Sequence, residues 1–423
     1  MGIDVISLIV FIACIGLFIW DKLPMATTAI LGCVAMVLLG VCDFKVAFGQ
    51  FASSTVILTA GVMVIGAAIS ETGLAAAIGA WIVKISKGSE VKLIIGTYLA
   101  SALMSAFLTN SAVLAIFIPI IMGLSATGSI KSKNLIMPIA IGCVLGGATT
   151  LVGSTQQMTA QGLLEEAGLR VFKTFDFAPV GGIIVVVGLI YCLTIGRKLA
   201  SKIWGDRDEE ADDSVLTPTA VSNPSKVKMI IMGVIFASTV VFYITEWVPL
   251  AITSTAAALL CIITGCISQK KAILSVNWNI VGRLAGCLGI AKALEAAGGT
   301  KLIAQGFSYL IGDSISPYLL FCILVLLVLV SSQFISNSTA ILIVLPILIA
   351  VAPSMGLNAY TYALGITIAS GIALSSPLAS STLGMSMSVG FKFNDYFKHS
   401  ILLDIISYIL IITLVPLFYG LTV

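Results

Sequence analysis

Apolar runs of about 20 residues recur along the 423 residues of this chain, for example Ile3 to Trp20, Met229 to Glu246 and Ile401 to Leu421. A helix of that length crosses the hydrocarbon core of a bilayer, whereas the strands of a membrane barrel alternate between apolar and polar residues. With 59% hydrophobic and 10% charged residues, the chain is also too apolar for an ordinary soluble surface. The sequence therefore predicts an all-α polytopic membrane protein.

The second half of the sequence restates the first. Pro24 opens an apolar run that closes at Gly40, and Pro249 opens one that closes at Gly265, an offset of 225 positions at both ends. We count five spans and one re-entrant hairpin in each half. Because an odd number of crossings inverts the second half, the sequence predicts two inverted-topology repeats with a site near the bilayer midplane.

The repeats are expected at residues 1–199 and 227–423, joined by a polar linker at 200–226 that contains Trp204 and an acidic cluster. Most of the 22 basic residues fall on the linker's side of the predicted spans. The positive-inside rule then places the linker in the cytoplasm and both termini outside a plasma or bacterial inner membrane. The first apolar run lacks the flanks of a signal peptide, so we expect it to be a retained span.

Each half contains one polar interruption of the same design. Asn110 stands between two hydroxyl residues, five positions after a serine and nine before a proline, and Asn337 has the same neighbours at the same spacing. The apolar arms on either side have about 13 to 16 residues, which is short for a crossing. We therefore expect re-entrant helical hairpins at about 93–124 and 317–352 that turn at mid-depth.

A second polar interruption follows later in each half, at residues 146–157 and 371–382. Glycine, proline and hydroxyl residues at the middle of a span predict an unwound segment whose free carbonyl and amide groups bind a ligand. We therefore expect broken helices at about 136–166 and 359–390.

The residue types at these positions limit the ligand. No acidic residue lies between Glu90 and Glu165 or between Asp313 and Asp395, so we expect both sites to lack a carboxylate, and the tips and breaks also lack basic residues. Neutral hydroxyl, amide and carbonyl oxygens suit an alkali cation such as sodium better than a proton or a divalent metal. An anion would be held by helix N-termini, by asparagine and serine donors and by the bound cations.

Other polar residues fall inside or beside the predicted spans. Lys292 and Glu295 are expected to pair locally, and Arg283 either reaches the cytoplasmic interface or serves a substrate path. His399 is expected to be a solvated loop residue, and the cysteines to be small core residues.

The paired asparagine-centred tips and paired breaks resemble the divalent anion/sodium symporter family of the ion transporter superfamily. The tips of that family read Ser-Asn-Thr, and here they read Thr-Asn-Ser and Ser-Asn-Ser. The family typically has a Thr-Pro-Pro-Asn stretch at the breaks. This chain has other residues at those positions, which border the anion according to the resemblance. The resemblance implies a homodimer in the lipid bilayer that moves a transport domain past a scaffold like an elevator, with sodium as coupling ion and no cofactor.

The resemblance also implies two sodium sites and an anion site between the tips. The first sodium site would comprise Ser105, Thr109, Asn110 and the carbonyl of Gly153. The second would comprise Ser332, Ser336, Asn337 and the carbonyl of Ala379. The anion would contact Asn110, Ser111, Ser154, Thr155, Asn337, Ser338 and Ser380.

The leading hypothesis is thus a secondary active symporter of sodium and a small anion, a dicarboxylate or sulfate. The alternative is a proton-coupled antiporter or exporter of the same superfamily, moving arsenite, citrate or sodium, and the expected lack of carboxylates counts against it. An ion channel is disfavoured by the inverted repeats. The sequence offers no nucleophile beside a base for an enzyme, and a net charge of +3 gives no reason to expect nucleic acid as a partner.

Overall fold

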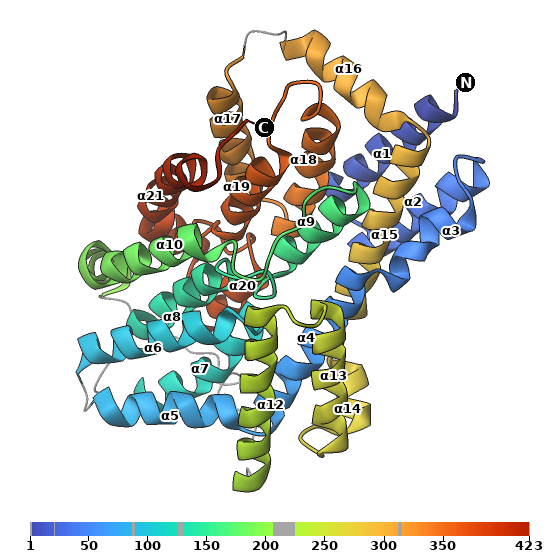
Figure 1. Ribbon diagram of the computed structural model, residues 1–423. Coiled ribbons are helices and arrows are strands. Elements are labelled where there is room, and N and C mark those ends of the chain that lie inside the picture. Colours follow the sequence, from blue (N-terminus) through green and yellow to red (C-terminus); the bar gives the residue numbers. More distant parts are fainter. Residues whose placement is uncertain are drawn as a thin grey trace.

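The computed structural model describes residues 2–20, 22–86, 89–125, 131–205, 225–311 and 315–422. Within these ranges the regular secondary structure is helical (Figure 1), as the composition predicts. The helices of the first half are α1 (Ile3–Trp20), α2 (Met25–Leu38), α3 (Phe44–Phe48), α4 (Ser54–Glu71), α5 (Leu74–Ser86), α6 (Glu90–Ser105), α7 (Asn110–Ser125), α8 (Ser132–Gly147), α9 (Thr155–Glu166), α10 (Ala178–Tyr191) and α11 (Arg197–Trp204).

The second half follows the same order of long and short helices. They are α12 (Lys226–Thr245), α13 (Leu250–Ile263), α14 (Gln269–Ser275), α15 (Trp278–Ala296), α16 (Gly299–Ile311), α17 (Pro317–Ser331), α18 (Asn337–Val351), α19 (Ala359–Gly371), α20 (Ser381–Ser386) and α21 (Phe393–Tyr419). Helices α2 and α13 both end just before a glycine in the left-handed region, Gly40 and Gly265, each with φ of 69°.

Helices at corresponding positions of the two halves each pack against helices of the other half. Helix α2 packs along α15, and its counterpart α13 packs along α4. Likewise α9 packs against α18 and α19 of the other half, while α20 packs against α7 and α8. In Figure 1, α9 and α20 lie in the middle of the molecule between hairpin α6–α7 and hairpin α17–α18. This exchange is what a two-fold relation between the halves produces, and their inversion across a bilayer stays a prediction.

Five helical stretches of the described residues are long and apolar enough to cross a bilayer, or six if α14 and α15, bent by 52°, form one span. Helices α2 and α13 have only 14 residues each, about 21 Å of helix against a core of about 30 Å. The count of five spans per half therefore stays a prediction. Leu38, Trp247 and Ile263 leave 78 to 80% of their surface exposed, which suits a lipid-facing surface.

Two expectations are wrong, one about Trp204 at the end of the first half and one about His399 in the second half. Trp204 ends α11 and is 1% exposed, with its indole N–H donating to Asn134 Oδ1 at 3.0 Å, so it is a core residue and no part of a solvated linker. His399 lies in α21, 2% exposed, with its ring 5.4 Å from that of Trp204, so it is no solvated loop residue. The rest of the predicted linker, 206–224, lies outside the described residues.

Seven of the nine cysteines are buried and none of the nine is in a disulfide, which confirms their expected role as core residues. Cys42 and Cys322 are only half-buried. Within the described ranges, no group of three His, Cys, Asp or Glu side chains could hold a metal ion.

Candidate functional site

The first hairpin turns where the sequence predicts it, between the end of α6 at Ser105 and the start of α7 at Asn110. Ser105 donates its hydroxyl to Asn110 Oδ1 at 2.6 Å, and Ser154 from the first break donates to the same oxygen at 3.5 Å. Gly147 lies so close that an added Cβ would sit 2.2 Å from Asn110 Oδ1. The fold thus brings three predicted site residues to one point.

Carbonyl oxygens also converge on the first break. A Cβ on Gly153 would lie 2.9 Å from the carbonyl oxygen of Ser105 and 2.6 Å from that of Gly147, so only glycine fits there without movement. The side chain of Gln157 donates to the carbonyl of Gly147 at 3.1 Å, and its own oxygen Oε1 is buried without a hydrogen-bond partner. The carbonyl oxygens of Ser105 and Gly147 and the side-chain oxygen of Gln157 thus form a polar cluster, and none of these contacts involves a charged group.

Thr150 ties this break to the hairpin tip. Its hydroxyl donates to the carbonyl of Ala106 and accepts from the backbone N–H of Gly153 at 3.1 Å. The carbonyl of Thr109 accepts the first backbone hydrogen bond of α7, from the N–H of Ala112 at 3.0 Å. A neutral hydroxyl therefore joins the first break to its tip, in addition to the contact of Ser154 with Asn110.

The second hairpin turns between Ser331, the end of α17, and Asn337, the start of α18. Three buried side-chain oxygens of this tip have no hydrogen-bond partner within the described structure: Ser332 Oγ, Gln333 Oε1 and Asn337 Oδ1. Ser332 and Asn337 correspond to the bonded pair of the first tip. Because buried polar atoms are almost always satisfied, three such atoms within six positions make this tip a candidate site for a cation or a water molecule.

A carboxylate at the second break contradicts the prediction that both sites lack one. Asp404, on α21 and 2% exposed, accepts from the backbone N–H groups of Leu374 and Ser375, each at 3.1 Å, and from the hydroxyl of Ser375 at 2.5 Å. It also accepts from Gln333 Nε2 of the tip at 2.8 Å. The prediction fails because the acidic residue comes from the last helix, far along the chain from the break.

The two breaks end in the same way. Ser154 and Ser380 precede α9 and α20 with nearly equal backbone angles, φ −147° and ψ 154° against φ −146° and ψ 148°. Ser380 accepts from the N–H of Leu383 at 3.3 Å. The N–H of Ala379 donates to the carbonyl of Ser376 at 3.2 Å.

Hydroxyl pairs join the tips to the breaks of the opposite half. Ser111 bonds Ser381 at 2.7 Å, and Ser338 bonds Thr155 at 3.0 Å. These pairs occupy corresponding positions, so each hairpin tip reaches across to the second part of the other broken helix. Four hydroxyl groups therefore line the region between the tips where the anion is predicted.

Arg283 contradicts the predicted absence of basic residues from the tips. Its guanidinium donates to Ser336 Oγ at 3.4 Å and lies 3.4 Å from the sulfur of Met25, so it contacts the second tip instead of a bilayer interface. Ser336 also caps α18 by accepting from the N–H of Thr339 at 3.3 Å. In the parts of the chain described here, no carboxylate forms an ion pair with Arg283.

Polar contacts anchor the end of α9 to neighbouring helices α4 and α15. Ser54, at the start of α4, donates to Glu165 at 2.6 Å, and Lys292 donates to the carbonyl of Glu166 at 2.9 Å. Lys292 also pairs with Glu295 at 3.2 Å, which confirms the predicted local ion pair. The C-terminal end of α9 is thus held by α4 of the first half and by α15 of the second half.

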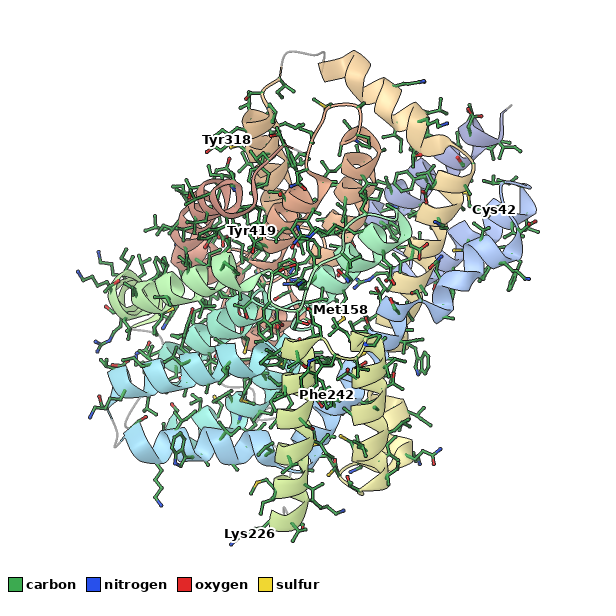
Figure 2. All side chains as sticks on the ribbon, in the orientation of Figure 1. Cys42, Met158, Lys226, Phe242, Tyr318 and Tyr419 are labelled. Carbon is green, nitrogen blue, oxygen red and sulfur yellow. The ribbon has the colours of Figure 1, made fainter. Side chains whose placement is uncertain are left out.

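An apolar contact continues this junction. Met158 of α9, labelled in Figure 2, packs with Leu58 and Val62 of α4 and with Tyr243 of α12 in a small cluster separate from the main core. Thr59 donates its hydroxyl to the sulfur of Met158 at 3.0 Å.

Sequence reasoning did not assign Asp404, Gln333, Gln157 or Ser381 to the sites, and it considered Arg283 only for a substrate path or the cytoplasmic interface. Asp404 and Arg283 carry charge inside apolar runs, which by itself marks a residue as a functional candidate. Gln333, Gln157 and Ser381 lie within two positions of predicted site residues. The local sequence does not show that their side chains reach the tips and breaks.

Two family models match this chain. One described as "Citrate transporter" matches residues 15–315, and one described as "Sodium:sulfate symporter transmembrane region" matches residues 225–422. Together they cover both halves, including both hairpins and both breaks.

Several relatives carry the name of transporters without a stated substrate. The chain is 29% identical over 181 residues to the uncharacterized transporter YfbS of Escherichia coli and 30% identical over 186 residues to the uncharacterized transporter sll0640 of Synechocystis. These matches cover 43% and 44% of this chain but only 30% of each relative. An uncharacterized transporter of Haemophilus influenzae is 24% identical over 382 residues, 86% of this chain and 80% of that protein.

Solved structures share the fold at low sequence identity. The YdaH transporter of Alcanivorax borkumensis gives a TM-score of 0.67 at 14% identity, over 92% of this chain and 89% of that one. MtrF of Neisseria gonorrhoeae gives a TM-score of 0.63 at 11% identity, over 92% and 84% of the two chains. The YdaH structure is described as having an unusual topology, and MtrF as illuminating a class of antimetabolite efflux pumps.

Proposed function

Because this chain belongs to the citrate transporter family, within the ion transporter superfamily, we propose that it imports a small anion, a dicarboxylate or sulfate, together with sodium ions. It is a membrane-embedded transporter and not an enzyme. The coupling ion and the substrate class are the parts of this statement that need an experiment.

The observation that carries the proposal is the matched serine and asparagine at the two hairpin tips. At the first tip, the oxygens of Ser105, Asn110 and Ser154 meet beside the break. At the second, the oxygens of Ser332 and Asn337 are buried without a partner. Uncharged oxygens gathered at a helix break suit a weakly hydrated alkali cation held inside a bundle.

The region between the tips suits an anion. In each hydroxyl pair, Ser111 with Ser381 and Ser338 with Thr155, one hydroxyl donates to the other and the second keeps its proton for a ligand, and helices α7, α9, α18 and α20 all begin there. The guanidinium of Arg283 reaches the second tip, and no carboxylate among the described residues forms an ion pair with it. Carboxylate and sulfate oxygens are natural acceptors for these donors.

The direct test is uptake of radiolabelled succinate, citrate and sulfate into proteoliposomes, with sodium, potassium or choline outside and the membrane potential clamped. Accumulation that needs external sodium is the expected result and identifies the anion. Uptake at the same rate in potassium would refute sodium coupling.

The site assignment is tested by Asn110→Ala and Asn337→Ala. Each removes an amide oxygen from one tip, so we expect sodium-driven uptake to be lost while the folded protein is retained. Asn279→Ala is the matched control, because Asn279 is exposed at the start of α15. Wild-type rates in either tip variant would exclude that tip from the site.

A proton-coupled exchanger is the second candidate, and Asp404 is the observation that favours it. A buried carboxylate at the second break, bonded to the tip through Gln333, is the kind of group that carries a proton in transporters. Uptake or efflux of the same anions that ignores sodium and follows an imposed pH gradient would support this candidate.

We further propose that the hairpins and broken helices move as one body in a homodimer, as the family resemblance implies. The contact between Ser54 and Glu165 would then have to break during transport. Cross-linking Ser54→Cys to Glu165→Cys, in a chain without its native cysteines, should block uptake, and reduction should restore it. Uptake that persists in the cross-linked protein would refute this movement, and the mass of the purified protein in detergent tests the dimer.

A further inference from the structure

The environment of Asp404 differs from that of an ordinary buried acid. Four donor groups reach its carboxylate: two backbone N–H groups, one hydroxyl and the side-chain amide of Gln333. All four are neutral, and no Lys or Arg forms an ion pair with Asp404 in the described parts of the chain. Hydrogen-bond donors on both carboxylate oxygens favour the ionised form, burial without a counter-ion opposes it, and a cation bound at the tip shifts the balance toward the charged form.

Gln333 connects this charge to the tip. Its Nε2 group donates to Asp404 at 2.8 Å, which fixes the orientation of the side-chain amide. The other end of the same amide, Oε1, is buried without a donor, as are Ser332 Oγ and Asn337 Oδ1. The amide, polarised by Asp404, therefore keeps an unpartnered oxygen in the same tip that holds the unpartnered oxygens of Ser332 and Asn337.

The first site has no such arrangement. Ala106 stands where the second tip has Gln333, and the break there is tied to the tip by the hydroxyl of Thr150. The oxygen of Asn110 is already satisfied by Ser105. Because neutral groups, Thr150 and Ser154, hold the first break at its tip, a full charge is not required merely to cap the second one.

We propose that Asp404, acting through Gln333, makes the second hairpin tip the tighter of two cation sites. This inference rests on the proposed sodium-coupled function and goes beyond it, because it assigns unequal affinities to the two tips. The ligand is one monovalent cation, bound by the oxygens of Ser332, Gln333 and Asn337. Asp404 is a positioning residue that does not itself touch the cation.

The electrostatic argument sets the direction of the effect. A negative charge one side chain away from a cation stabilises it by more than neutral oxygens can, because the bundle interior screens charge less than water does. Replacing Asp404 by asparagine keeps the shape and most of the hydrogen bonds but removes the charge. Sodium affinity at the second tip should then fall by about tenfold or more.

The test uses binding to the purified full-length protein, which does not require transport. The melting temperature is titrated with NaCl and with LiCl, and choline chloride keeps the ionic strength constant, so that a ligand of the folded state gives its half-saturation concentration. The variants are Asp404→Asn, Asp404→Glu and Gln333→Ala. Gln333→Ala reproduces the first tip, where Ala106 already occupies that position. Glu71→Gln is the control for loss of a carboxylate in an exposed ion pair.

We expect Asp404→Asn and Gln333→Ala to raise the sodium half-saturation concentration about tenfold and to alter the ratio of sodium to lithium affinity. Asp404→Glu should recover part of the loss, and Glu71→Gln should match the wild type. A role limited to capping the break would lower the melting temperature equally at all sodium concentrations, and that result would overturn the proposal. If Asp404→Asn does not fold, Gln333→Ala decides, and a wild-type titration in that variant overturns the proposal.

Failure of this inference can be told apart from failure of the proposed function. Sodium stabilisation of the wild type without sodium-driven uptake would overturn the symport and leave the tighter second site standing. Sodium-driven uptake with unchanged titrations in both variants would overturn only the inference. A wild type that sodium does not stabilise would overturn the inference by itself, and the uptake assay would then judge the function independently.

Discussion

Gly147→Ala should damage the first tip while leaving the fold intact. The new Cβ would lie 2.2 Å from Asn110 Oδ1 and 2.5 Å from Ser154 Oγ, whereas real contacts of this kind essentially never fall below 3.0 Å. Because both obstacles are ends of side chains, the backbone can stay while Asn110 moves by about 0.8 Å. That shift breaks or weakens its 2.6 Å hydrogen bond with Ser105.

The cost follows from the hydrogen bond. A buried hydrogen bond that is lost costs about 1–3 kcal/mol, which corresponds to a roughly 5- to 150-fold weaker apparent sodium affinity if Asn110 is a ligand. The assay is the sodium dependence of anion uptake in proteoliposomes, with the melting temperature in detergent measured alongside. Gly233→Ala is the matched control, because that glycine also lies inside a helix, α12, and its added Cβ would meet nothing within 4 Å.

A wild-type sodium half-saturation concentration in Gly147→Ala would refute the reasoning, since the oxygen at this point would then play no part in coupling. An unfolded variant is not expected.

Three further outcomes are expected. Ser111→Ala and Ser381→Ala should be coupled in a double-mutant cycle of anion affinity by about 0.5 kcal/mol or more, because their hydroxyls lie 2.7 Å apart, and strict additivity would show that this contact is irrelevant to binding. Arg283→Gln should raise the anion half-saturation concentration with little change in the sodium dependence, and the reverse pattern in uptake kinetics would assign the arginine to the cation instead. Trp204→Phe should lower the unfolding free energy by about 1–3 kcal/mol, because Asn134 Oδ1 loses its indole donor, and an unchanged melting temperature in detergent would contradict this.

Asp404 changes how the coupling ion should be judged. The neutral first tip supports an alkali cation, whereas the second tip contains a carboxylate that the linear sequence placed outside both sites. The sodium and proton hypotheses therefore differ at one tip, and experiments on Asp404 and Gln333 bear on the choice more directly than experiments at the first tip.

Helices begin and end close to where local sequence patterns predict them, while the re-entrant form of the hairpins and the inverted repeats stay predictions. Hairpins expected at 93–124 and 317–352 have arms at 90–125 and 317–351, and the breaks fall at 148–154 and 372–380, inside the stretches rich in glycine and hydroxyl residues. These features are predictable because a run of apolar residues, a glycine or an asparagine acts on the backbone within a few positions of itself. Because the two halves of the sequence repeat the same pattern, each type of element was predicted from two separate segments.

The sequence by itself determined that this protein is an all-helical membrane transporter with paired polar tips and breaks. Only the tertiary structure decided which side chains meet there. Gln333 and Asp404 are 71 positions apart and Arg283 and Ser336 are 53 apart, so no local pattern relates them. Helix packing sets such contacts, because it rotates one face of a distant helix toward the tip, and that rotation depends on every neighbour the helix touches.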